Sequence, residues 1–166
     1  PRHNIDVINV TLSKTVVAQN VSMNVTVTVK NMGAYPETFD VAAYRNDTAI
    51  PLPSGELYIS LRLKSRYSKT IIFTWNTTGS LKGNYTIKAV ASGWETFFDG
   101  WVYVGIPGDV DGNNFVEIKD ILAIALAYGS YPGHPNYNPN LDVNGDEFVD
   151  IKDILTAALN FGQSDP

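Results

Sequence analysis

A 21-residue segment occurs twice in the chain, and this duplication constrains the fold more than any other feature. Residues 109–129 read DVDGNNFVEIKDILAIALAYG, and residues 142–162 read DVNGDEFVDIKDILTAALNFG. Thirteen of the 21 aligned positions are identical. Such self-similarity indicates that one structural unit is used twice. Each copy begins with an oxygen-rich stretch and continues into a helical apolar pattern, which predicts a loop followed by a helix.

The first twelve residues of each copy have the spacing of a calcium-binding loop. Calcium takes six to eight oxygen ligands at roughly 2.3–2.6 Å, and a twelve-residue loop supplies them from positions 1, 3, 5, 7, 9 and 12. Position 7 contributes only its backbone carbonyl, so an aromatic residue is tolerated there. The sequence therefore predicts two bound Ca²⁺ ions, with the following ligands: Asp109, Asp111, Asn113, Phe115, Glu117 and Asp120 in the first loop, and Asp142, Asn144, Asp146, Phe148, Asp150 and Asp153 in the second.

Two positions depart from the usual EF-hand loop. Position 12 is Asp120 or Asp153, which is shorter than the usual Glu. Position 6 normally holds glycine at positive φ, but Asn114 and Glu147 stand there. Because Asn adopts that conformation more readily than Glu, we expect less backbone strain in the first loop. Magnesium prefers a tighter octahedron and suits these loops less well. Helix capping alone explains one or two Asp per copy, not six matched positions.

An apolar repeat with helical spacing follows each loop. Gly129 and Gly162 end the two predicted helices, as glycine commonly does. Val116 and Val149, at loop position 8, are expected to join the two loops in a common core. The residues that form one stripe on each helix are Ile118, Ile121, Leu122, Ala125 and Leu126 in the first copy, and Ile151, Ile154, Leu155, Ala158 and Leu159 in the second.

The preceding hundred residues alternate with a period of two instead. In residues 21–30, VSMNVTVTVK, every second residue is apolar, which predicts a strand with one buried face. Residues 56–64 show the same pattern, with Leu57, Ile59, Leu61 and Leu63 expected to point inward. Further strands are predicted near 5–12, 38–45, 67–75, 84–91 and 101–104, and Trp75 is expected in the core. Short strands separated by turn-type clusters indicate an all-β immunoglobulin-like sandwich.

Composition and charge exclude several classes of function. The chain has no Cys, which rules out disulfides, thiol catalysis and Cys-based zinc sites. Residues 1–104 carry 10 basic and 7 acidic side chains, whereas residues 105–166 carry 2 and 10. An acidic C-terminal part disfavours nucleic acid and suits cations. The apolar runs are too short for membrane insertion. We expect no enzyme, because the sequence shows no catalytic constellation. We interpret the chain as a piece of a longer protein.

The two copies, with PNYNPNLDVNGD between them, resemble the duplicated loop–helix segments of a type I dockerin domain over about residues 106–166. Asp at loop position 12 is similar to the dockerin pattern, while a non-Gly position 6 departs from it. The connector rich in Pro and Asn is similar to archaeal members. The resemblance implies a small all-α, EF-hand-like, calcium-dependent domain. It also implies a cohesin-like partner, through which the protein attaches to a scaffold or cell surface.

The dockerin resemblance further implies partner contacts at loop positions 10 and 11. In this chain these are Ile118 and Lys119 in the first copy, and Ile151 and Lys152 in the second. The same pair in both copies would allow two binding orientations related by the internal two-fold. Ile118 and Ile151 also belong to the apolar stripes, so packing in the core stays open as an alternative for them.

The N-terminal part resembles the CARDB-type and other immunoglobulin-like adhesion modules of extracellular proteins. The resemblance rests on VTVTVKNMGAYPETFDVAAY (25–44) and TIIFTWNTTGSLKGNYTIKAVAS (70–92). The acidic turn usual in that family is replaced here by GWETFFDG (93–100). An extracellular or cell-surface location is also favoured by N-x-[ST] sequons, which stand at Asn9, Asn20, Asn24, Asn46, Asn76 and Asn84.

The sequence thus predicts two domains, residues 1–105 and 106–166, joined by a short stiff linker. We expect some of the aromatic residues in 94–101 to mediate packing between them. The first hypothesis for function is a non-catalytic, calcium-dependent interaction module. The second is a structural, calcium-stabilised stalk or surface-layer segment with no partner. The third is a carbohydrate-binding sandwich that uses the aromatic residues as a platform.

Overall fold

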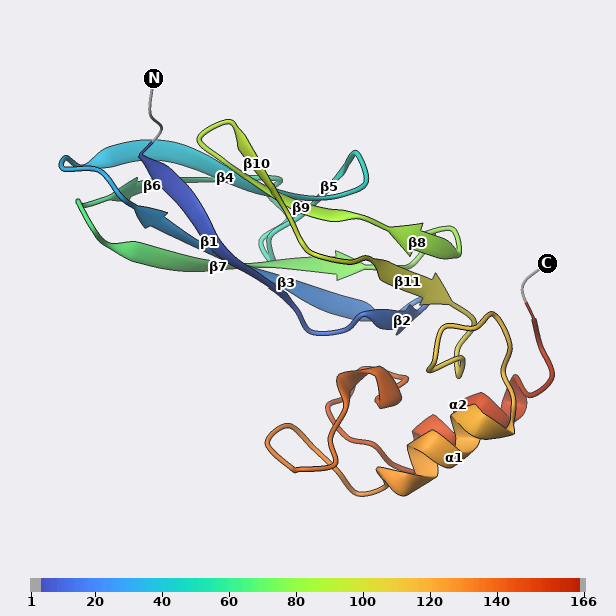
Figure 1. Cartoon of the computed structure of the whole chain (residues 1–166). Coiled ribbons are helices and arrows are strands. Elements are labelled where there is room, and N and C mark those ends of the chain that lie inside the picture. The colour runs from blue at the N-terminus through green and yellow to red at the C-terminus, as the bar shows by residue number, and fades with distance from the viewer. Residues whose placement is uncertain (1–3, 165–166) are drawn as a thin grey trace. The chain divides into compact units, whose positions relative to one another are not determined.

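The computed structural model describes residues 4–164 of the chain. No helix in this range is both long enough and apolar enough to cross a bilayer. The elements follow one another in the order shown in Figure 1: β1 (Ile5–Leu12), β2 (Val16–Ala18), β3 (Ser22–Asn31), β4 (Glu37–Arg45), β5 (Thr48–Ile50), β6 (Ile59–Leu63), β7 (Ser68–Asn76), β8 (Gly83–Tyr85), β9 (Ile87–Ala91), β10 (Trp94–Phe97), β11 (Val102–Gly105), α1 (Ile118–Leu126), the 3₁₀ helix η1 (Pro139–Leu141) and α2 (Ile151–Leu159).

The chain forms two compact units that do not follow its linear order. The first unit contains the chain up to Leu12, together with Asn24–Trp75 and Tyr85–Trp101. The second contains Ser13–Met23, Asn76–Asn84 and the chain from Val102 onward. Two short segments from the β-rich part therefore belong to the unit that carries the repeat. The division of the chain into domains 1–105 and 106–166 stays a prediction.

The first unit is built from two sheets. One has the strand order β1-β3-β7, and the other has the order β10-β9-β4-β5, with β6 also paired to β4. The predicted alternation in β3 is confirmed, because Val25, Val27 and Val29 are fully buried and the intervening residues are not. Trp75 on β7 is also buried, as predicted, and its ring meets Tyr85 edge-on with 4.9 Å between ring centroids.

Two features of the first unit differ from the prediction. β6 begins only at Ile59, and Leu57 is 54% exposed, so its predicted inward position is wrong. The reason is a hydrogen-bonded turn: Leu52 N–H donates to Glu56 O, and Gly55 N–H donates to Leu52 O. The strands β5 and β10, and β2 in the second unit, were not predicted, because three or four residues are too few to show a period.

The second unit has a small sheet of its own, with the order β2-β11-β8. β11 pairs in parallel with β2, and Tyr103, Val104 and Gly105 face Val16, Val17 and Ala18 in turn. All four residues of β11 are buried. This sheet leads directly into the first copy of the repeat.

The two predicted helices are present, but of the apolar stripe residues only Ile121 and Ile154 pack against the core, and both are only partly buried. In α1 the buried residues are Asp120 and Ile124, and in α2 they are Asp153 and Ala157. Because each Asp points inward from the first turn, the residue four positions later lies on the same inner face. The stripe residues Ile118 and Ile151 are 66% and 60% exposed, so the alternative that they pack in the core is wrong.

The two copies are connected through loop position 8, as predicted. Val116 and Val149 are buried in one hydrophobic cluster that also contains Ile124 and Ala157. Each valine also exchanges backbone hydrogen bonds with the residues that follow the other copy's helix. These bonds join Val116 N–H to Gln163 O (2.9 Å), Gly162 N–H to Val116 O (2.8 Å), Val149 N–H to Ser130 O (3.0 Å) and Gly129 N–H to Val149 O (2.7 Å).

Candidate metal centres

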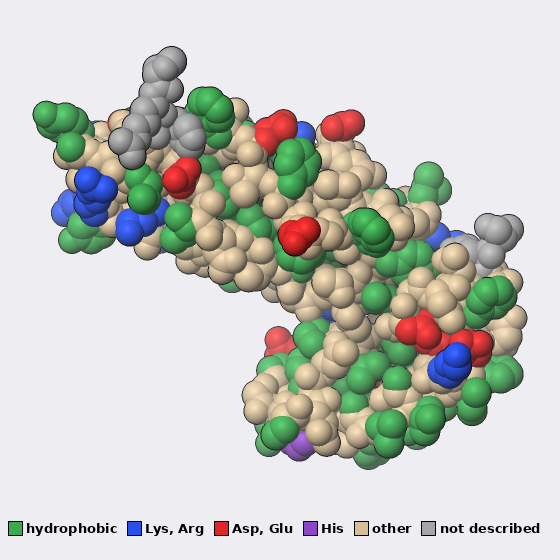
Figure 2. Space-filling view, in the orientation of Figure 1, with side chains coloured by type: hydrophobic (Ala, Val, Ile, Leu, Met, Phe, Trp, Pro, Cys, Tyr) green, Lys and Arg blue, Asp and Glu red, His purple; other side chains and the backbone are tan. Residues whose placement is uncertain are grey.

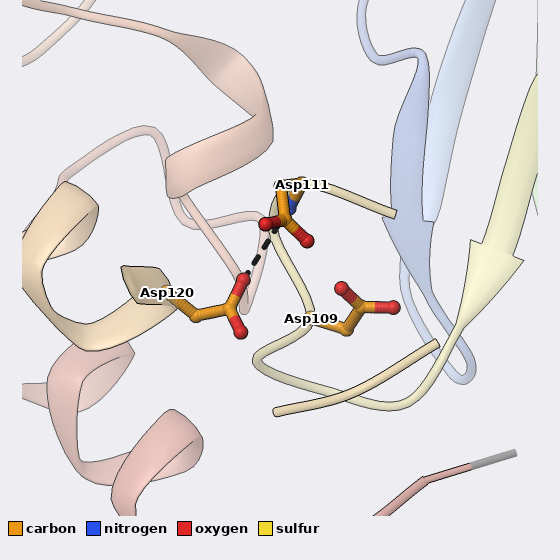
Figure 3. A group of neighbouring side chains, drawn as sticks. All are labelled: Asp109, Asp111 and Asp120. Carbon is orange, nitrogen blue, oxygen red and sulfur yellow. Dashed lines mark hydrogen bonds between the residues drawn. The ribbon is translucent and has the colours of Figure 1, made fainter. Parts of the chain in front are cut away.

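Each loop gathers three carboxylates at one point. In the first loop the residues are Asp109, Asp111 and Asp120, and in the second they are Asp142, Asp146 and Asp153; within each group, carboxylate oxygens lie within 4.8 Å of one another. Figure 3 shows the first group, with Asp120 reaching from the start of α1 toward the loop that carries Asp111 and Asp109. Both clusters use loop positions 1 and 12. The third and exposed member is at position 3 in the first loop (Asp111) and at position 5 in the second (Asp146).

Loop position 1 organises the turn in both copies through its carboxylate. Asp109 Oδ1 accepts the N–H of Gly112 (3.1 Å) and Asn113 (3.2 Å), and its Oδ2 accepts the N–H of Asn114 (3.0 Å). Asp142 repeats these contacts one for one, accepting from Gly145 (3.0 Å), Asp146 (3.2 Å) and Glu147 (2.9 Å). The loop backbone therefore wraps around this side chain.

Loop position 12 closes each loop onto its helix. Asp120 Oδ1 accepts the N–H of Val110 (3.0 Å), and its Oδ2 accepts the N–H of Glu117 (2.9 Å). The second copy repeats this arrangement: Asp153 accepts from Val143 (2.8 Å) and from Asp150 (2.8 Å). Asp is long enough for these contacts, so the shorter side chain at position 12 still spans from helix to loop.

The backbone at loop position 6 has the conformation that the sequence predicted. Asn114 has φ of 74° and Glu147 has φ of 69°. Both values lie in the left-handed region, which Asn tolerates better than Glu. Position 4 also has positive φ in both copies, and there glycine supplies it, as Gly112 (72°) and Gly145 (76°).

The buried carboxylates repel one another and resist ionisation. Burial raises the pKa of Asp109 to about 6, and a hydrogen bond with Asp111 and the nearby Asp120 add to the shift. Burial also raises the pKa of Asp120, Asp142 and Asp153, in each case against backbone N–H groups that favour the charged form. A cation placed among these groups would remove that unfavourable charge.

The donor set fits a hard divalent cation. Only oxygen ligands are present in the two clusters, which suits calcium or magnesium and not a metal that prefers nitrogen or sulfur. Oxygens within 4.8 Å of one another can share one ion, since two metal–oxygen bonds of roughly 2.4 Å span about that distance. The two clusters can therefore each hold one metal ion.

The other predicted ligands lie in the same loops but outside the carboxylate clusters. Glu117 and Asp150, at position 9, stand at the N-caps of α1 and α2 and take part in capping boxes. Asn113 Nδ2 donates to Glu117 Oε1 (3.0 Å), which links positions 5 and 9 of the first loop. For these residues, and for Asn144 and the carbonyls of Phe115 and Phe148, the ligand role stays a prediction.

Sequence reasoning missed three side chains that hold the loops against the rest of the second unit. Lys14, which is only 7% exposed, donates from Nζ to the backbone carbonyls of Pro139 and Asp142. Asn140 Oδ1 accepts the N–H groups of Thr15 (3.0 Å) and Val16 (3.1 Å). Tyr103 Oη donates to Asn114 Oδ1. Lys14 and Asp142 are 128 positions apart in the sequence, and no local pattern signals their contact.

The predicted partner residues are on the surface. Lys119 and Lys152 are exposed, like Ile118 and Ile151 beside them. Further apolar side chains on the same helices are also exposed; these are Leu122 (55%), Leu126 (73%), Leu155 (54%) and Leu159 (75%). Figure 2 shows hydrophobic side chains on the visible surface of the part that contains α1 and α2. An apolar surface of this kind is typical of interaction sites.

Among the aromatic residues of segment 94–101 in the first unit, three side chains are exposed, namely Trp94 (52%), Phe97 (57%) and Trp101 (61%). Phe97 lies 6.0 Å from the Lys88 ammonium, which also forms an ion pair with Glu95 at 3.0 Å. Phe97 is the cross-strand neighbour of Lys88 in the pairing of β10 with β9. The predicted roles of the aromatic residues in sugar binding and in packing between domains stay predictions.

Comparison with known families identifies the N-terminal part. Residues 5–96, more than half of the chain, match the CARDB family model. The chain belongs to the CARDB family. The predicted immunoglobulin-like β fold and CARDB resemblance are thereby confirmed for this part. The CARDB match ends before the repeat begins, so a separate all-α dockerin domain in 106–166 stays a prediction.

Solved structures similar to this CARDB chain share little sequence with it. The CARDB domain of a Pyrococcus furiosus protein, solved in complex with di-metal ions, is 21% identical with a TM-score of 0.44, and the alignment covers 58% of this chain and 94% of that one. An alkylpurine DNA glycosylase from Pseudomonas fluorescens is 9% identical with a TM-score of 0.49 over 61% of this chain. A β-glucosidase from Listeria innocua is 15% identical with a TM-score of 0.47.

This chain spans only 30% of the glycosylase and 16% of the β-glucosidase. A comparison with curated proteins gives no match. These likenesses carry no activity over to this chain.

Proposed function

We propose that this chain is a non-catalytic, extracellular interaction module in which a dockerin-like repeat binds two Ca²⁺ ions and, when loaded, docks onto a cohesin-like partner. The observation that carries the proposal is the pair of matched carboxylate clusters, Asp109–Asp111–Asp120 and Asp142–Asp146–Asp153. Four of these six residues are buried. Buried carboxylates at such close range destabilise the fold unless a cation neutralises them.

Calcium suits these loops better than magnesium. Each loop offers side-chain oxygens at five positions and a carbonyl at a sixth, which matches the six to eight oxygens that calcium takes. Magnesium retains several waters and is usually bound through one or two carboxylates. Millimolar calcium is characteristic of the extracellular side, where sites of modest affinity fill.

The exposed apolar side chains of α1 and α2 supply the docking surface. Loading would fix the first turn of each helix, because Asp120 and Asp153 belong both to a carboxylate cluster and to that turn. The helix residues Ile118, Leu122 and Leu126 and their counterparts in the second copy would then be presented in a fixed arrangement. Metal binding and partner binding are linked in this proposal through the helix N-termini.

An extracellular location is supported by the sequons. All six asparagines lie on the surface of the molecule, where an acceptor site must be for glycan attachment. Their spread over several strands and turns leaves the helices free of attached glycans. Mass spectrometry of the chain expressed in a glycosylating host would test this part of the proposal.

The first experiment is a calorimetric titration of chelator-stripped protein with calcium, with the helix signal followed in parallel. The expected result is two equivalents bound and a rise in helicity. Asp120→Asn and Asp153→Asn each remove one charge from one cluster and should each reduce the uptake at one site. An absence of calcium uptake at millimolar concentration would overturn the proposal.

The second experiment measures binding to a panel of immobilised cohesin modules with calcium and with chelator. Leu126→Asp should weaken binding at least tenfold if α1 forms part of the interface, since a buried charge is costly there. Leu81→Asp is the matched control, because Leu81 is 81% exposed in the segment Asn76–Asn84, away from the helices in sequence. Equal binding with calcium and with chelator would contradict a calcium-dependent interaction.

A second candidate function is a calcium-stabilised structural segment with no partner. It is favoured by the contacts of Lys14, Asn140 and Tyr103, which tie both loops to β2, β11 and their flanking residues. Such ties would stiffen the chain when the ions are bound. Loss of stiffness in chelator, measured by small-angle scattering, combined with no binding to any cohesin module, would favour this function over the first.

A further inference from the structure

Lys14 places a buried, positively charged side chain against the second loop, in addition to any bound metal ion. Its Nζ donates to the backbone carbonyls of Pro139 and Asp142, and its side chain is almost fully buried. Asp142 and Asp153 both attract the ammonium, although burial lowers the pKa of Lys14 overall. The positive charge of Lys14 in turn favours the ionised form of Asp142.

The position of Lys14 is fixed from both sides. The next two residues, Thr15 and Val16, donate their N–H groups to Asn140 Oδ1 at 3.0 and 3.1 Å. Asn140 belongs to η1, and its Nδ2 also donates to Thr15 Oγ1 at 3.0 Å. The strand β2 and the connector between the copies therefore hold Lys14 at the start of the second loop.

The charges around the first loop differ from those around the second. The side chain that reaches this loop from β11 is neutral and contacts loop position 6, where Tyr103 Oη donates to Asn114 Oδ1. The charged groups that act on Asp109 are the acidic residues Asp120 and Asp111. The predicted ligands of the two loops carry the same formal charge, four carboxylates in each. Lys14 is therefore a charged neighbour that distinguishes two loops whose predicted ligands carry equal charge.

We propose that Lys14 makes the two loops inequivalent: its fixed charge holds the second loop folded before an ion arrives and weakens that loop's affinity for calcium relative to the first. The inference rests on the proposed calcium-binding function. In the ion-free chain the ammonium offsets repulsion among Asp142, Asp146 and Asp153. In the loaded chain the same ammonium repels the ion, and the expected difference in affinity is roughly tenfold.

The test uses the backbone amides of Gly112 and Gly145 in the full chain as matched reporters, followed by NMR during a calcium titration. These amides donate to Asp109 and Asp142 in the two loops, at 3.1 and 3.0 Å. Gly112 should respond at the lower calcium concentration and Gly145 at a concentration roughly tenfold higher. In chelator, the Gly145 amide should exchange with solvent more slowly than the Gly112 amide.

Lys14→Met keeps most of the apolar stem and removes the charge. It should bring the two calcium midpoints closer together and abolish the extra protection of Gly145 in chelator. Lys82→Met, at an exposed lysine of the same unit, is the control and should change neither. The wild-type midpoints alone test the inference should the Lys14 variant not fold.

The outcomes separate the inference from the function on which it rests. Equal midpoints in the wild type, or a first response from Gly145, would overturn the inference and leave calcium binding intact. An unchanged gap between midpoints in Lys14→Met would show that the charge is not its cause. The absence of any response at millimolar calcium would overturn the proposed function and the inference with it.

Discussion

The two units of this molecule are built around opposite kinds of interior. The first unit buries valine, isoleucine, phenylalanine and tryptophan side chains between two sheets, with Val25, Val27 and Val29 as its most regular row. The second unit also has an apolar cluster, but its interior includes the carboxylates of Asp109, Asp120, Asp142 and Asp153. The first kind of core needs no ligand, whereas we expect the second to gain stability when a cation neutralises its carboxylates.

Truncation of the central tryptophan should have the largest effect and should be confined to the first unit. Trp75→Ala removes a side chain that is 2% exposed and should lower the free energy of unfolding by about 3–5 kcal/mol. The loss should be the same with calcium and with chelator, measured by denaturant unfolding followed through hydrogen exchange in β3. Tyr67→Ala, at a tyrosine that is 63% exposed, is the control and should change stability by less than about 0.5 kcal/mol.

Removal of calcium should destabilise the second unit and leave the first unit unchanged. At a hundredfold excess over Kd, one bound ion stabilises the folded form by about 2.7 kcal/mol, and this is lost in chelator. Hydrogen exchange should quicken in α1 and α2 and remain unchanged in β3 and β9. Equal loss of protection in both units would show that calcium affects the stability of the first unit as well as that of the second.

The pH dependence of the free energy of unfolding should have opposite signs without and with bound calcium. Since burial raises the pKa of Asp109 to about 6 from 3.8, the ion-free folded form holds its proton longer than the unfolded chain. Its free energy of unfolding should therefore fall as pH rises from about 4 to about 6, by on the order of 1–2 kcal/mol after solvent screening.

With saturating calcium the trend should reverse, because the ion needs ionised ligands and its stabilisation is lost as pH falls through the same range. Thermal unfolding at a series of pH values, with calcium and with chelator, measures both slopes. Parallel slopes in the two conditions would contradict the link between these carboxylates and the metal.

The smallest expected effect distinguishes the two loops from each other. Glu147→Gly places glycine at φ of 69° and should stabilise the second unit by about 1 kcal/mol, because glycine has no steric penalty there. Asn114→Gly at φ of 74° should gain less, since Asn tolerates the left-handed region. Thermal unfolding in saturating calcium measures both, and a larger gain at Asn114 would contradict the expected order of strain.

The sequence predicted best where its pattern reflects local geometry. The alternation in residues 21–30 identified β3, and the positive φ at Asn114 and Glu147 followed from loop spacing. The helices were located correctly, but the buried face was not anticipated, because a hydrophobic pattern gives no sign that Asp120 and Asp153 turn inward. The carboxylate pattern contained that information, since a ligand at position 12 must face the loop.

Contacts between distant residues could not be predicted from the sequence. Nothing near Lys14 in the chain distinguishes it from a surface lysine, and its burial depends on residues 139–142. The strands β2, β5 and β10 are too short to show a period in the sequence. Each is defined by its pairing with a longer neighbouring strand. Their presence is a property of the assembled sheets.

The backbone bonds at loop position 8 have a consequence for how the repeat arose. Each valine, Val116 or Val149, is paired with the chain that follows the helix of the other copy, never with its own. A single copy would leave those amides and carbonyls without partners, and burial makes that costly. A single motif that associated with a second molecule of itself would satisfy them in the same way. The repeat thus has the form of a symmetric homodimer carried on one chain.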